Sequence, residues 1–342
     1  MLKSKKNAAY IIAEVGQNHQ GDFELAKEYI LKFSERGADA IKFQKRDNKN
    51  LFSKNKFNQL YENQNSFGKT YGLHREELEF NIEQMITLKQ MCEDCEVDFI
   101  CTPFDEKSLE QLLVIDTKIL KIASFDMGNL RLISEILKNN VKLILSAGGS
   151  NIEIVKKTIE FVLNFSNKIT LLHCVSNYPA LPNELQLHKI QDYKNLFSKI
   201  QIGLSDHFNG PLSGPVGFLY GAEVFEKHVT FNRAWKGTDH SFALSLSGFE
   251  QFVKDINRTN LMGLKNKNSE DRIGKEFVFT KLGKSLIAEK SIKKNEIFSI
   301  NNLSGKIFVE NGIPVRQMVN LIGKKSKNDY DTGALIKDEE ME

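Results

Sequence analysis

Side chains capable of chemistry gather at the ends of eight short apolar runs in this sequence. These end positions are Glu14, Lys42, Gln44, Thr102, Lys121, Ser124, Ser146, Ser176, Asn177, Tyr178, Ser205, His207, Glu226 and His228. Lysines supply positive charge and hydroxyls donate hydrogen bonds, so together they suit a phosphate-bearing anion. A single lysine there is usually solvated, and a single serine is more often a turn cap than a ligand. The predicted anion site therefore depends on the coincidence of many such residues.

Two histidines, His207 and His228, close the last two of these runs. Two imidazoles on neighbouring strands can hold a divalent metal and leave several coordination positions open. Without a thiolate, the pair suits Mn, Co or Mg better than a closed structural zinc site. From spacing alone, two hydrogen-bonded histidines without a metal are an equally weighted alternative. His19 stands alone after the first run, and the missing His-x-His pattern disfavours an amidohydrolase-type metal hydrolase.

The elements that must position these residues alternate along the chain. The apolar runs predict strands at 10–15, 40–44, 97–104, 118–124, 141–146, 169–176, 200–206 and 222–230. Most are continuously apolar, as parallel strands buried on both faces require. Helical patterns occupy 22–36, 75–96, 106–113, 130–139, 151–164 and 212–220, and 183–197 is mixed. Asp22 and Asn151 are expected to be N-caps.

This alternation predicts an α/β protein with a (β/α)8 TIM barrel. The carboxyl ends of barrel strands are where barrel enzymes carry their active sites, and the polar residues stand at those ends. A doubly wound open sheet is the structural alternative. It is disfavoured because no Gly-x-Gly-x-x-Gly follows the first predicted strand.

Two segments break the alternation. Residues 45–74 are rich in Asn, Lys, Gln and Tyr, and so long a loop in a compact domain is usually a functional lid or disordered. A last helix at 249–264 completes a predicted barrel of residues 1–264. A polar, charged stretch then predicts a linker at 265–281. Short strand-like pieces with regular glycines predict a small β-rich domain at 282–342.

The composition narrows the class of protein. The 342 residues are 41% hydrophobic and 27% charged, with a formal net charge of +3. This charge gives no basic stripe and argues against a nucleic-acid partner. No apolar run is long enough to span a membrane, and the one after Lys6 is too short for a signal peptide. The four cysteines are interpreted as reduced thiols, because zinc sites need paired ligands. We expect a cytoplasmic protein without a membrane partner.

Several motifs in order carry a family resemblance. They are Ile-Ala-Glu-Val-Gly-Gln-Asn-His-Gln-Gly at 12–21, Ala-Asp-Ala-Ile-Lys-Phe-Gln at 38–44, Lys-Ile-Ala-Ser-Phe at 121–125, Leu-His-Cys at 172–174, Tyr-Pro at 178–179, Gly-Leu-Ser-Asp-His at 203–207 and Glu-Lys-His at 226–228. Through the barrel, the chain resembles the sialic acid (nonulosonic acid) synthase family, which includes N-acetylneuraminate synthase. Residues 282–342 resemble, less sharply, the antifreeze-like SAF domain of that family.

The resemblance implies condensation of phosphoenolpyruvate with an open-chain N-acyl hexosamine and release of phosphate. The sugar would be N-acetylmannosamine or a deoxy or di-N-acyl relative. His207 and His228 would hold a divalent metal, with Mn expected and Mg or Co as alternatives. Phosphoenolpyruvate would contact Lys42, Thr102, Lys121, Ser124, Ser146, Ser176, Asn177 and Ser205. The sugar would contact Glu14, Gln44, Asp126, Tyr178 and Asp239.

The same resemblance implies that Glu14 acts near the reacting centre, together with the two lysines and the two histidines. It also implies a homodimer in which the tail domain of one subunit caps the active site of the other. Asp126 stands where the family often has glutamate, and the predicted lid at 45–74 differs from familiar members. Phe308 stands where the family commonly has an arginine that reaches the partner's sugar, with Arg316 or Lys306 as possible replacements. These departures leave the sugar open.

Two other functions are alternatives to the synthase. A related phosphoenolpyruvate-condensing barrel of the KDO-phosphate or DAHP type would act on an aldose phosphate. It would need further basic residues at the barrel mouth and would leave the tail domain unexplained. A catalytically silent binding module predicts a damaged constellation, whereas both lysines and both histidines are present. The synthase is therefore the favoured interpretation.

Overall fold

The structure is a computed structural model that describes residues 1–166, 168–263, 273–309 and 312–341. The chain forms two compact units, residues 1–264 and 265–342. The division coincides with the expected end of the barrel domain. Among the described residues, no helix is long and apolar enough to cross a membrane.

The first unit is a closed barrel of eight strands in chain order, with β1 pairing to both β2 and β8. All neighbouring strands are parallel, which confirms the predicted (β/α)8 architecture. The strands are β1 (Tyr10–Gly16), β2 (Ala40–Lys45), β3 (Asp98–Pro103), β4 (Ile119–Ile122), β5 (Lys142–Ser146), β6 (Ile169–Cys174), β7 (Gln201–Asp206) and β8 (Val224–His228).

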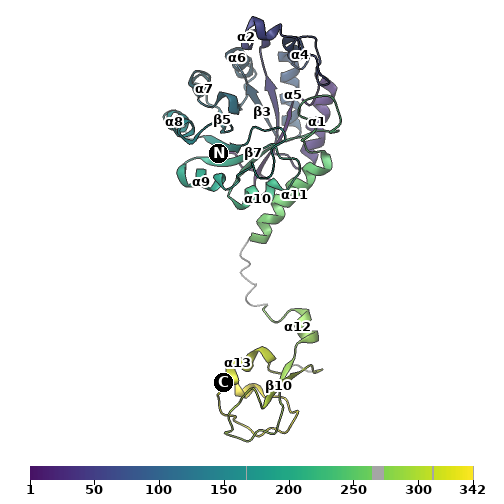
Figure 1. Ribbon diagram of the computed structural model, residues 1–342, viewed down its shortest axis with the longest axis vertical. Helices are drawn as coiled ribbons and strands as arrows, with labels where there is room; N and C mark the ends of the chain where they lie inside the picture. The colour runs from purple at the N-terminus through teal and green to yellow at the C-terminus, as the bar shows by residue number, and fades with distance from the viewer. Residues whose placement is uncertain (167, 264–272, 310–311, 342) are drawn as a thin grey trace. The chain divides into compact units, whose positions relative to one another are not determined.

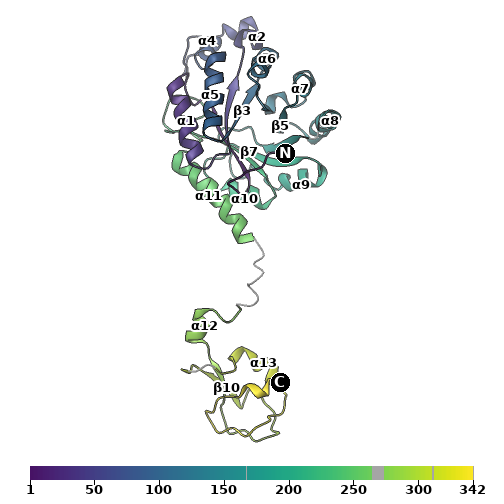
Figure 2. The same ribbon diagram turned by 180° about the vertical axis from the view of Figure 1, so that it is seen from behind.

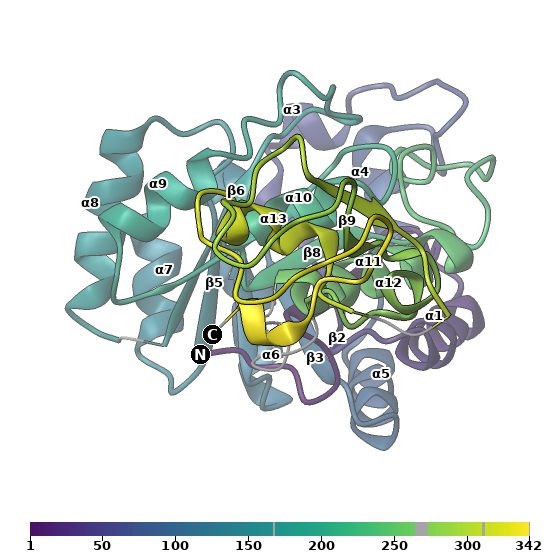
Figure 3. The same cartoon turned by 90° about the horizontal axis from the view of Figure 1, so that it is seen from below.

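Helices surround these strands (Figures 1 and 2). They are α1 (Phe23–Glu35), α2 (Asn48–Leu51), α3 (Lys54–Phe57), α4 (Tyr71–Glu76), α5 (Ile82–Asp94), α6 (Glu106–Val114), α7 (Leu130–Leu137), α8 (Ile152–Leu163), α9 (Lys189–Leu196), α10 (Ser213–Leu219) and α11 (Leu246–Gly263). Figure 3 shows α7, α8 and α9 along one side of the strands and α1 and α5 along the other. A short 3-10 helix, Ser124–Asp126, follows β4.

Helix starts follow local capping. The side chains of Asp22 and Asn151 accept hydrogen bonds from the backbone of α1 and α8, as predicted. The single helix predicted over 75–96 is instead two helices. Asn81 begins α5 with a capping box, and the preceding Phe80 is buried in the core. The break therefore combines a strong N-cap with tertiary burial that the helical pattern does not reveal.

The segment 45–74 is not a plain loop, because it contains α2, α3 and the start of α4. Lys56 on α3 lies 4.5 Å from the centre of the Tyr71 ring on α4, which ties the two short helices together. Its role as a lid stays a prediction.

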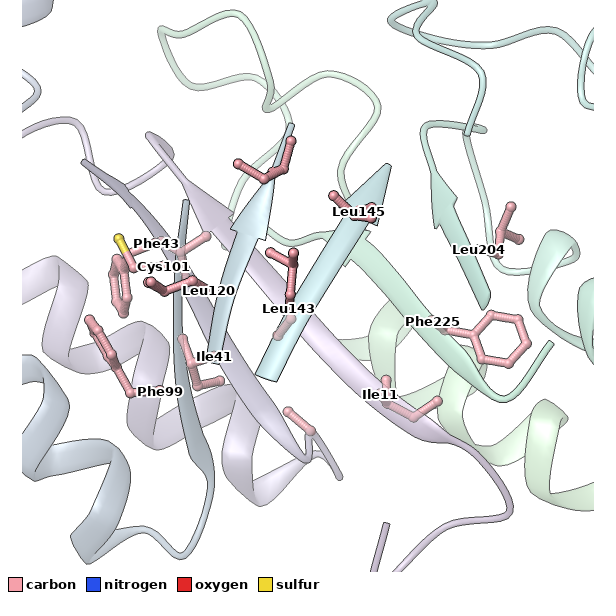
Figure 4. Close-up of a cluster of buried hydrophobic side chains, with 14 of the residues drawn as sticks. Ile11, Ile41, Phe43, Phe99, Cys101, Leu120, Leu143, Leu145, Leu204 and Phe225 are labelled. Carbon is pink, nitrogen blue, oxygen red and sulfur yellow. The ribbon is translucent and has the colours of Figure 1, made fainter. Parts of the chain in front are cut away.

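The core of the barrel unit has two layers, set by the alternation of side chains along each strand. One layer packs strands against helices, and Figure 4 shows part of it, including Ile41, Phe43 and Phe225. The other fills the inside of the barrel. Its strand members are Tyr10, Ile12, Ala40, Ile100, Ile119, Ile144, Leu172 and Val224. This inner layer is the apolar floor of the barrel.

The second unit is small and β-rich. Strands β9 (Ser285–Ala288) and β10 (Leu303–Lys306) pair antiparallel, and isolated bridges join further segments to β9 and to the loop after it. Its own apolar core includes Leu286, Phe298, Leu321 and Tyr330. Short helices α12 (Phe277–Leu282) and α13 (Met318–Leu321) complete it. Helix α12 falls mostly inside the predicted linker at 265–281, whose residues 265–272 lie outside the described residues.

Candidate active site

A polar layer lies directly above the apolar floor of the barrel. Because inward-facing residues recur every second position, each floor residue is followed two positions later by another inward residue. These second residues are Glu14, Lys42, Thr102, Lys121, Ser146, Cys174 and Glu226, and Ser205 takes the same place above Gly203 on β7. All of them are buried. The sequence thus folds an apolar plug with a ring of charge and hydroxyls at the carboxyl ends of the strands.

Lysines and carboxylates form one buried network in this ring. Lys42 Nζ lies 2.7 Å from Glu14 Oε2 and 3.8 Å from Glu226 Oε2. Lys121 Nζ lies 2.5 Å from Glu226 Oε1, to which the Ser205 hydroxyl also donates at 3.1 Å. The Glu226 carboxylate therefore lies between the two lysines that are expected to contact phosphoenolpyruvate.

The two carboxylates differ in their electrostatics. Burial alone would raise the pKa of Glu226, but the ammonium groups of Lys121 and Lys42 lower it to about 2. Burial raises the pKa of Glu14, with the Glu226 charge adding to the effect and Lys42 opposing it. Glu14 also accepts a hydrogen bond of 2.7 Å from Gln44 Nε2. Glu226 is therefore the fixed anion, and Glu14 is the carboxylate better suited to take up a proton.

The predicted histidine pair is also brought together. The rings of His207 and His228 lie 5.5 Å apart between centroids, and Tyr178 packs 4.2 Å from His207. His207 Nδ1 lies 2.8 Å from the Val175 carbonyl oxygen. Since a carbonyl can only accept, Nδ1 of the neutral ring carries the proton and Nε2 holds the lone pair. Burial alone would lower the pKa of His207, but its contacts with Cys174 and the Val175 carbonyl raise it.

The chemistry of this donor set fits a sparsely coordinated metal. Burial lowers the pKa of His228 to about 3, so its imidazole is neutral, as a metal ligand must be. His228 Nδ1 is buried without a hydrogen-bond partner, and Asp239 Oδ2 lies 3.8 Å away. In the described part of the chain, no group of three or more His, Cys, Asp or Glu side chains is arranged to hold a metal. A metal here would have few protein ligands.

Serine hydroxyls and one glycine form a further wall of the site. A Cβ on Gly148 would lie 2.3 Å from Ser176 Oγ and 2.6 Å from Ser124 Oγ, so only glycine fits where the backbone passes these serines. Cys174 Sγ lies 3.4 Å from Ser124 Oγ. Ser146 Oγ is buried and has no hydrogen-bond partner. This wall can therefore donate several hydrogen bonds to a bound anion.

Most predicted site residues line a single cavity. These are Glu14, Lys42, Gln44, Thr102, Lys121, Ser124, Tyr178, Ser205, His207 and His228. Ser176 and Asp239 are not part of its lining but stand close to it by the contacts above, and Ser146, also outside the lining, is the last residue of β5. Asp126 instead accepts from Asn129 Nδ2 at 2.9 Å, and Asn177 is exposed. The structure does not bring these last two into the cavity.

Sequence reasoning placed Glu226 at a strand end but assigned it no role, and it missed three further contributors to the site, Cys174, Phe104 and Gly148. Glu226, Cys174 and Phe104 line the cavity. Glu226 had a usable signal, because it stands two residues before His228 and must face the same way on a strand. Gly148 had none, since the sequence contains 22 glycines and their spatial neighbours are not readable from it.

A parallel barrel whose carboxyl-end mouth joins two lysines, two carboxylates and two histidines has the features of an enzyme active site. The model of the NeuB family matches residues 29–267. The chain belongs to this family of sialic and nonulosonic acid synthases, which confirms the predicted resemblance.

Individual relatives agree. The chain is 32% identical over 320 residues to human N-acetylneuraminate-9-phosphate synthase, covering 94% of this chain and 89% of that one. It is 34% identical over 337 residues to N,N'-diacetyllegionaminic acid synthase of Campylobacter jejuni, covering 96% and 98%. The solved N-acetylneuraminic acid synthetase of Leptospira borgpetersenii, in complex with citrate, superimposes with a TM-score of 0.69 at 28% identity. That match covers 80% of this chain and 93% of the other.

Proposed function

We propose that this enzyme condenses phosphoenolpyruvate with an open-chain N-acyl hexosamine and releases phosphate. The observation that carries the proposal is the carboxylate of Glu226 held between Lys42 and Lys121, beside the histidine pair. It marks a buried position for an anion next to two groups that fit a metal. The family membership supplies the reaction class.

The lysines and hydroxyls bind phosphoenolpyruvate in this proposal. Glu14 and Glu226 balance the charges of Lys42 and Lys121 in the structure, so neither lysine is buried without a counter-charge. The phosphate and carboxylate of phosphoenolpyruvate bring new negative charge to the same two lysines. Ser124, with Ser176 near it, supplies donors to those oxygens, and Ser146 at the end of β5 is a further proposed donor.

The bond changes assign a role to Glu14. The C3 carbon of phosphoenolpyruvate attacks the aldehyde carbon of the sugar, and a C–C bond forms while the aldehyde oxygen takes up a proton. Water then adds to C2, which has become electron-poor, and the C2–O bond to phosphate breaks. Glu14 is placed to stabilise the charge at C2 or to accept the proton of the attacking water, because its raised pKa favours proton uptake.

His207 and His228 hold a divalent metal in this proposal, with Mn expected and Mg or Co as alternatives. Such an ion supplies Lewis acidity, which polarises a carbonyl oxygen. The chain itself contributes a neutral His228 and a His207 whose Nε2 is left free by the bond to Val175. Both rings pack against Phe242, with centroids 5.1 and 6.1 Å from it, which fixes their orientation.

Gln44, Tyr178 and Asp239 are the proposed contacts for the sugar. Gln44 is bonded to Glu14, and Asp239 lies beside His228, so both flank the proposed reacting centre. The named relatives differ in their products, since one is named for a sugar acid with a 9-phosphate and the other for a di-N-acetyl sugar acid. The two product names have in common only that each is an N-acylated sugar acid.

For the C-terminal unit, we propose an SAF-type domain that caps the active site of a second subunit in a homodimer. The support is the resemblance of residues 282–342 and the separate apolar core of this unit. Phe308 is half-buried and is not among the residues of that core. An apolar ring here, in place of the family's arginine, favours a sugar with more apolar substituents.

The test is consumption of phosphoenolpyruvate by the full chain with Mn and a panel of N-acyl hexosamines. His207→Ala should abolish metal-dependent turnover, whereas His188→Ala, at an exposed position at the start of α9, should leave it intact. Equal turnover by His207→Ala and the parent, after chelator treatment and restoration of Mn, contradicts the metal assignment. Turnover confined to aldose phosphates without an N-acyl group contradicts the proposed substrate.

A further inference from the structure

The loop that joins β8 to α11, residues 229–245, carries Asp239. The Asp239 Oδ2 atom lies 3.8 Å from His228 Nδ1. The next residue, His240, is fully buried, and its Nδ1 lies 2.7 Å from Thr230 Oγ1. Gly237 has a φ of +143°, and a Cβ there would lie 2.8 Å from His240 Cδ2, so a side chain does not fit. The loop therefore folds closely around His240, and the backbone just before it sets where Asp239 stands.

Residues 61–74, which we call the brace, contact this loop. The brace is part of the segment expected to be a lid. The Asn65 side-chain oxygen accepts a hydrogen bond of 3.2 Å from the Gly237 backbone N–H. The Lys236 ammonium lies 4.6 Å from the centre of the Phe67 ring, a distance at which an aromatic ring attracts a cation. Two consecutive loop residues are thus bound to the brace.

The brace is closed on itself around one buried histidine. The Phe67 backbone N–H donates to His74 Nδ1 at 3.1 Å, and the two rings stack with centroids 5.8 Å apart. The Tyr61 ring packs 4.7 Å from His74, and the Tyr61 backbone N–H donates to the Lys69 carbonyl oxygen at 3.1 Å. A Cβ on Gly68 would lie 2.5 Å from the His74 backbone nitrogen, so the turn is tight. Phe67 is therefore presented to the loop from a well-packed turn.

The barrel holds the same loop from its other side. Gln20, in the turn after β1, donates from Nε2 to the Lys236 carbonyl oxygen at 3.1 Å, and the same atom lies 3.2 Å from His240 Nε2. The brace contacts differ from these, because they reach the Lys236 ammonium and the Gly237 N–H. Without the brace, the loop would keep its anchors at Lys236 and His240, and the residues between them, including Asp239, would be freer to move.

We infer that Asn65 and Phe67 are positioning residues, which hold Asp239 at the sugar side of the cavity by fixing the loop before it. The inference rests on the proposed function, in which Asp239 contacts the N-acyl hexosamine. Phosphoenolpyruvate is proposed to bind the lysines and hydroxyls of the barrel strands, outside this loop. Loss of the brace contacts should therefore weaken sugar binding and spare phosphoenolpyruvate binding. A residue that only stabilised the whole enzyme would not separate the two substrates.

Steady-state kinetics of the full chain with Mn test the inference, with N-acetylmannosamine and the other N-acyl hexosamines of the panel as acceptors. Asn65→Ala and Phe67→Leu should each raise KM for the sugar about two- to fivefold, the size expected of one hydrogen bond or one exposed cation–π contact. The KM for phosphoenolpyruvate should not change. Asn65→Asp keeps an acceptor oxygen and Phe67→Tyr keeps the ring, so both should stay near the parent.

Lys236 provides a double-mutant cycle for the same contact. Lys236→Met should raise KM for the sugar to a similar extent, and Lys236→Arg, which keeps the charge, should not. Combining Phe67→Leu with Lys236→Met should raise it no further than either change alone, because both remove one contact. Lys27→Met is the matched control, since Lys27 on α1 lies 4.7 Å from the Phe23 ring, outside the brace and the loop. It should behave like the parent.

Hydrogen exchange of the free enzyme separates the inference from the proposed function. The backbone amides of 229–245 should exchange faster when Asn65→Ala and Phe67→Leu are combined, with the barrel strands unchanged. Unchanged exchange in this loop, or faster exchange with an unchanged KM for the sugar, overturns the inference and leaves the synthase reaction in place. Equal rises in KM for both substrates also overturn it. A parent that turns over no N-acyl hexosamine of the panel contradicts the proposed function, and the role of Asp239 falls with it.

Discussion

Glu226, on the inward face of β8, shows how a single residue can order a binding site before substrate binds. Glu226 occupies the position between Lys42 and Lys121 and is kept ionised by them. Two buried lysines without counter-charges would repel each other and lose hydration, so the carboxylate stabilises their arrangement before substrate binds. The same carboxylate limits how strongly a second anion is attracted. Removing the charge of Lys121 or that of Glu226 should therefore change phosphoenolpyruvate binding. The first change removes a cation that contacts the substrate, and the second removes the anion that orders the lysines.

Lys121→Met keeps the aliphatic stem and removes the charge. We expect kcat/KM for phosphoenolpyruvate to fall by the equivalent of roughly 2–4 kcal/mol of transition-state stabilisation, because a buried charge partner is lost. Lys118→Met is the matched control, since Lys118 is 68% exposed just before the same strand. Steady-state kinetics of both variants measure this change in kcat/KM. Unchanged affinity together with unchanged turnover in Lys121→Met would show that this lysine does not contact the substrate.

Glu226→Gln keeps the shape of the side chain and removes its charge. The two lysines then lose the anion that holds them at 2.5 and 3.8 Å, so we expect kcat/KM to fall at least about tenfold, as for loss of a charge-assisted hydrogen bond in a closed site. Glu223→Gln, one residue before β8 and 49% exposed, is the control and should be near neutral. A variant that equals the parent in kinetics contradicts a role in ordering the lysines.

At the scale of elements, the strands that carry the histidines are locked together by a buried ion pair. Lys227 and Asp206 are cross-strand partners in the register of β7 and β8, with Nζ 2.5 Å from Oδ2 and neither side chain exposed. Lys227 also donates to the Phe208 carbonyl, and Ser213 donates to Asp206. Because neighbours on a strand face opposite ways, fixing these two outward residues fixes His207 and His228 inward.

Chemical denaturation of variants tests this lock. Lys227→Met should lower the free energy of unfolding by about 3–5 kcal/mol, because it leaves Asp206 charged and buried. Adding Asp206→Leu to it should recover much of that loss, since an apolar pair needs no counter-charge. The exposed pair Lys194–Glu223 is the control, and Lys194→Met should cost at most about 1 kcal/mol. Equal losses for Lys227→Met and Lys194→Met contradict the lock.

The strands were predictable from sequence, whereas the short helices α3 and α4 were less so. Runs such as Ile169–Cys174 are buried on both faces, so continuous apolarity identifies them. Asp22 and Asn151 likewise carry their capping signal locally. In contrast, α3 and α4 have four and six residues and depend on contacts such as Lys56 with Tyr71. Such contacts join residues far apart in sequence, so the helical pattern does not reveal them. No role was assigned to Glu226 from sequence for a related reason, because its contacts with the two lysines appear only when strand ends meet.

At the scale of the whole molecule, the chain contains two separate apolar cores. The barrel clusters draw only on residues up to Ile256, and the core of the C-terminal unit draws only on residues from Leu286 onward. Neither core needs the other to bury its own apolar side chains, so each unit has the means to fold alone. A role of the C-terminal unit in enclosing the sugar at a second subunit's site can therefore be tested with the barrel unit alone.

A barrel chain ending at Phe279 tests this whole-molecule role. It should fold, as followed by circular dichroism, and keep most of its affinity for phosphoenolpyruvate, because Lys42, Lys121 and the hydroxyls lie on barrel strands. It should bind the N-acyl hexosamine poorly, because part of the sugar's enclosure would come from another chain. Mixing it with full-length Lys121→Met, which has an intact tail but a damaged site, should restore turnover if capping acts between subunits. A monomeric truncated barrel with full activity would rule out the cap, since no second chain would then be needed to complete the site.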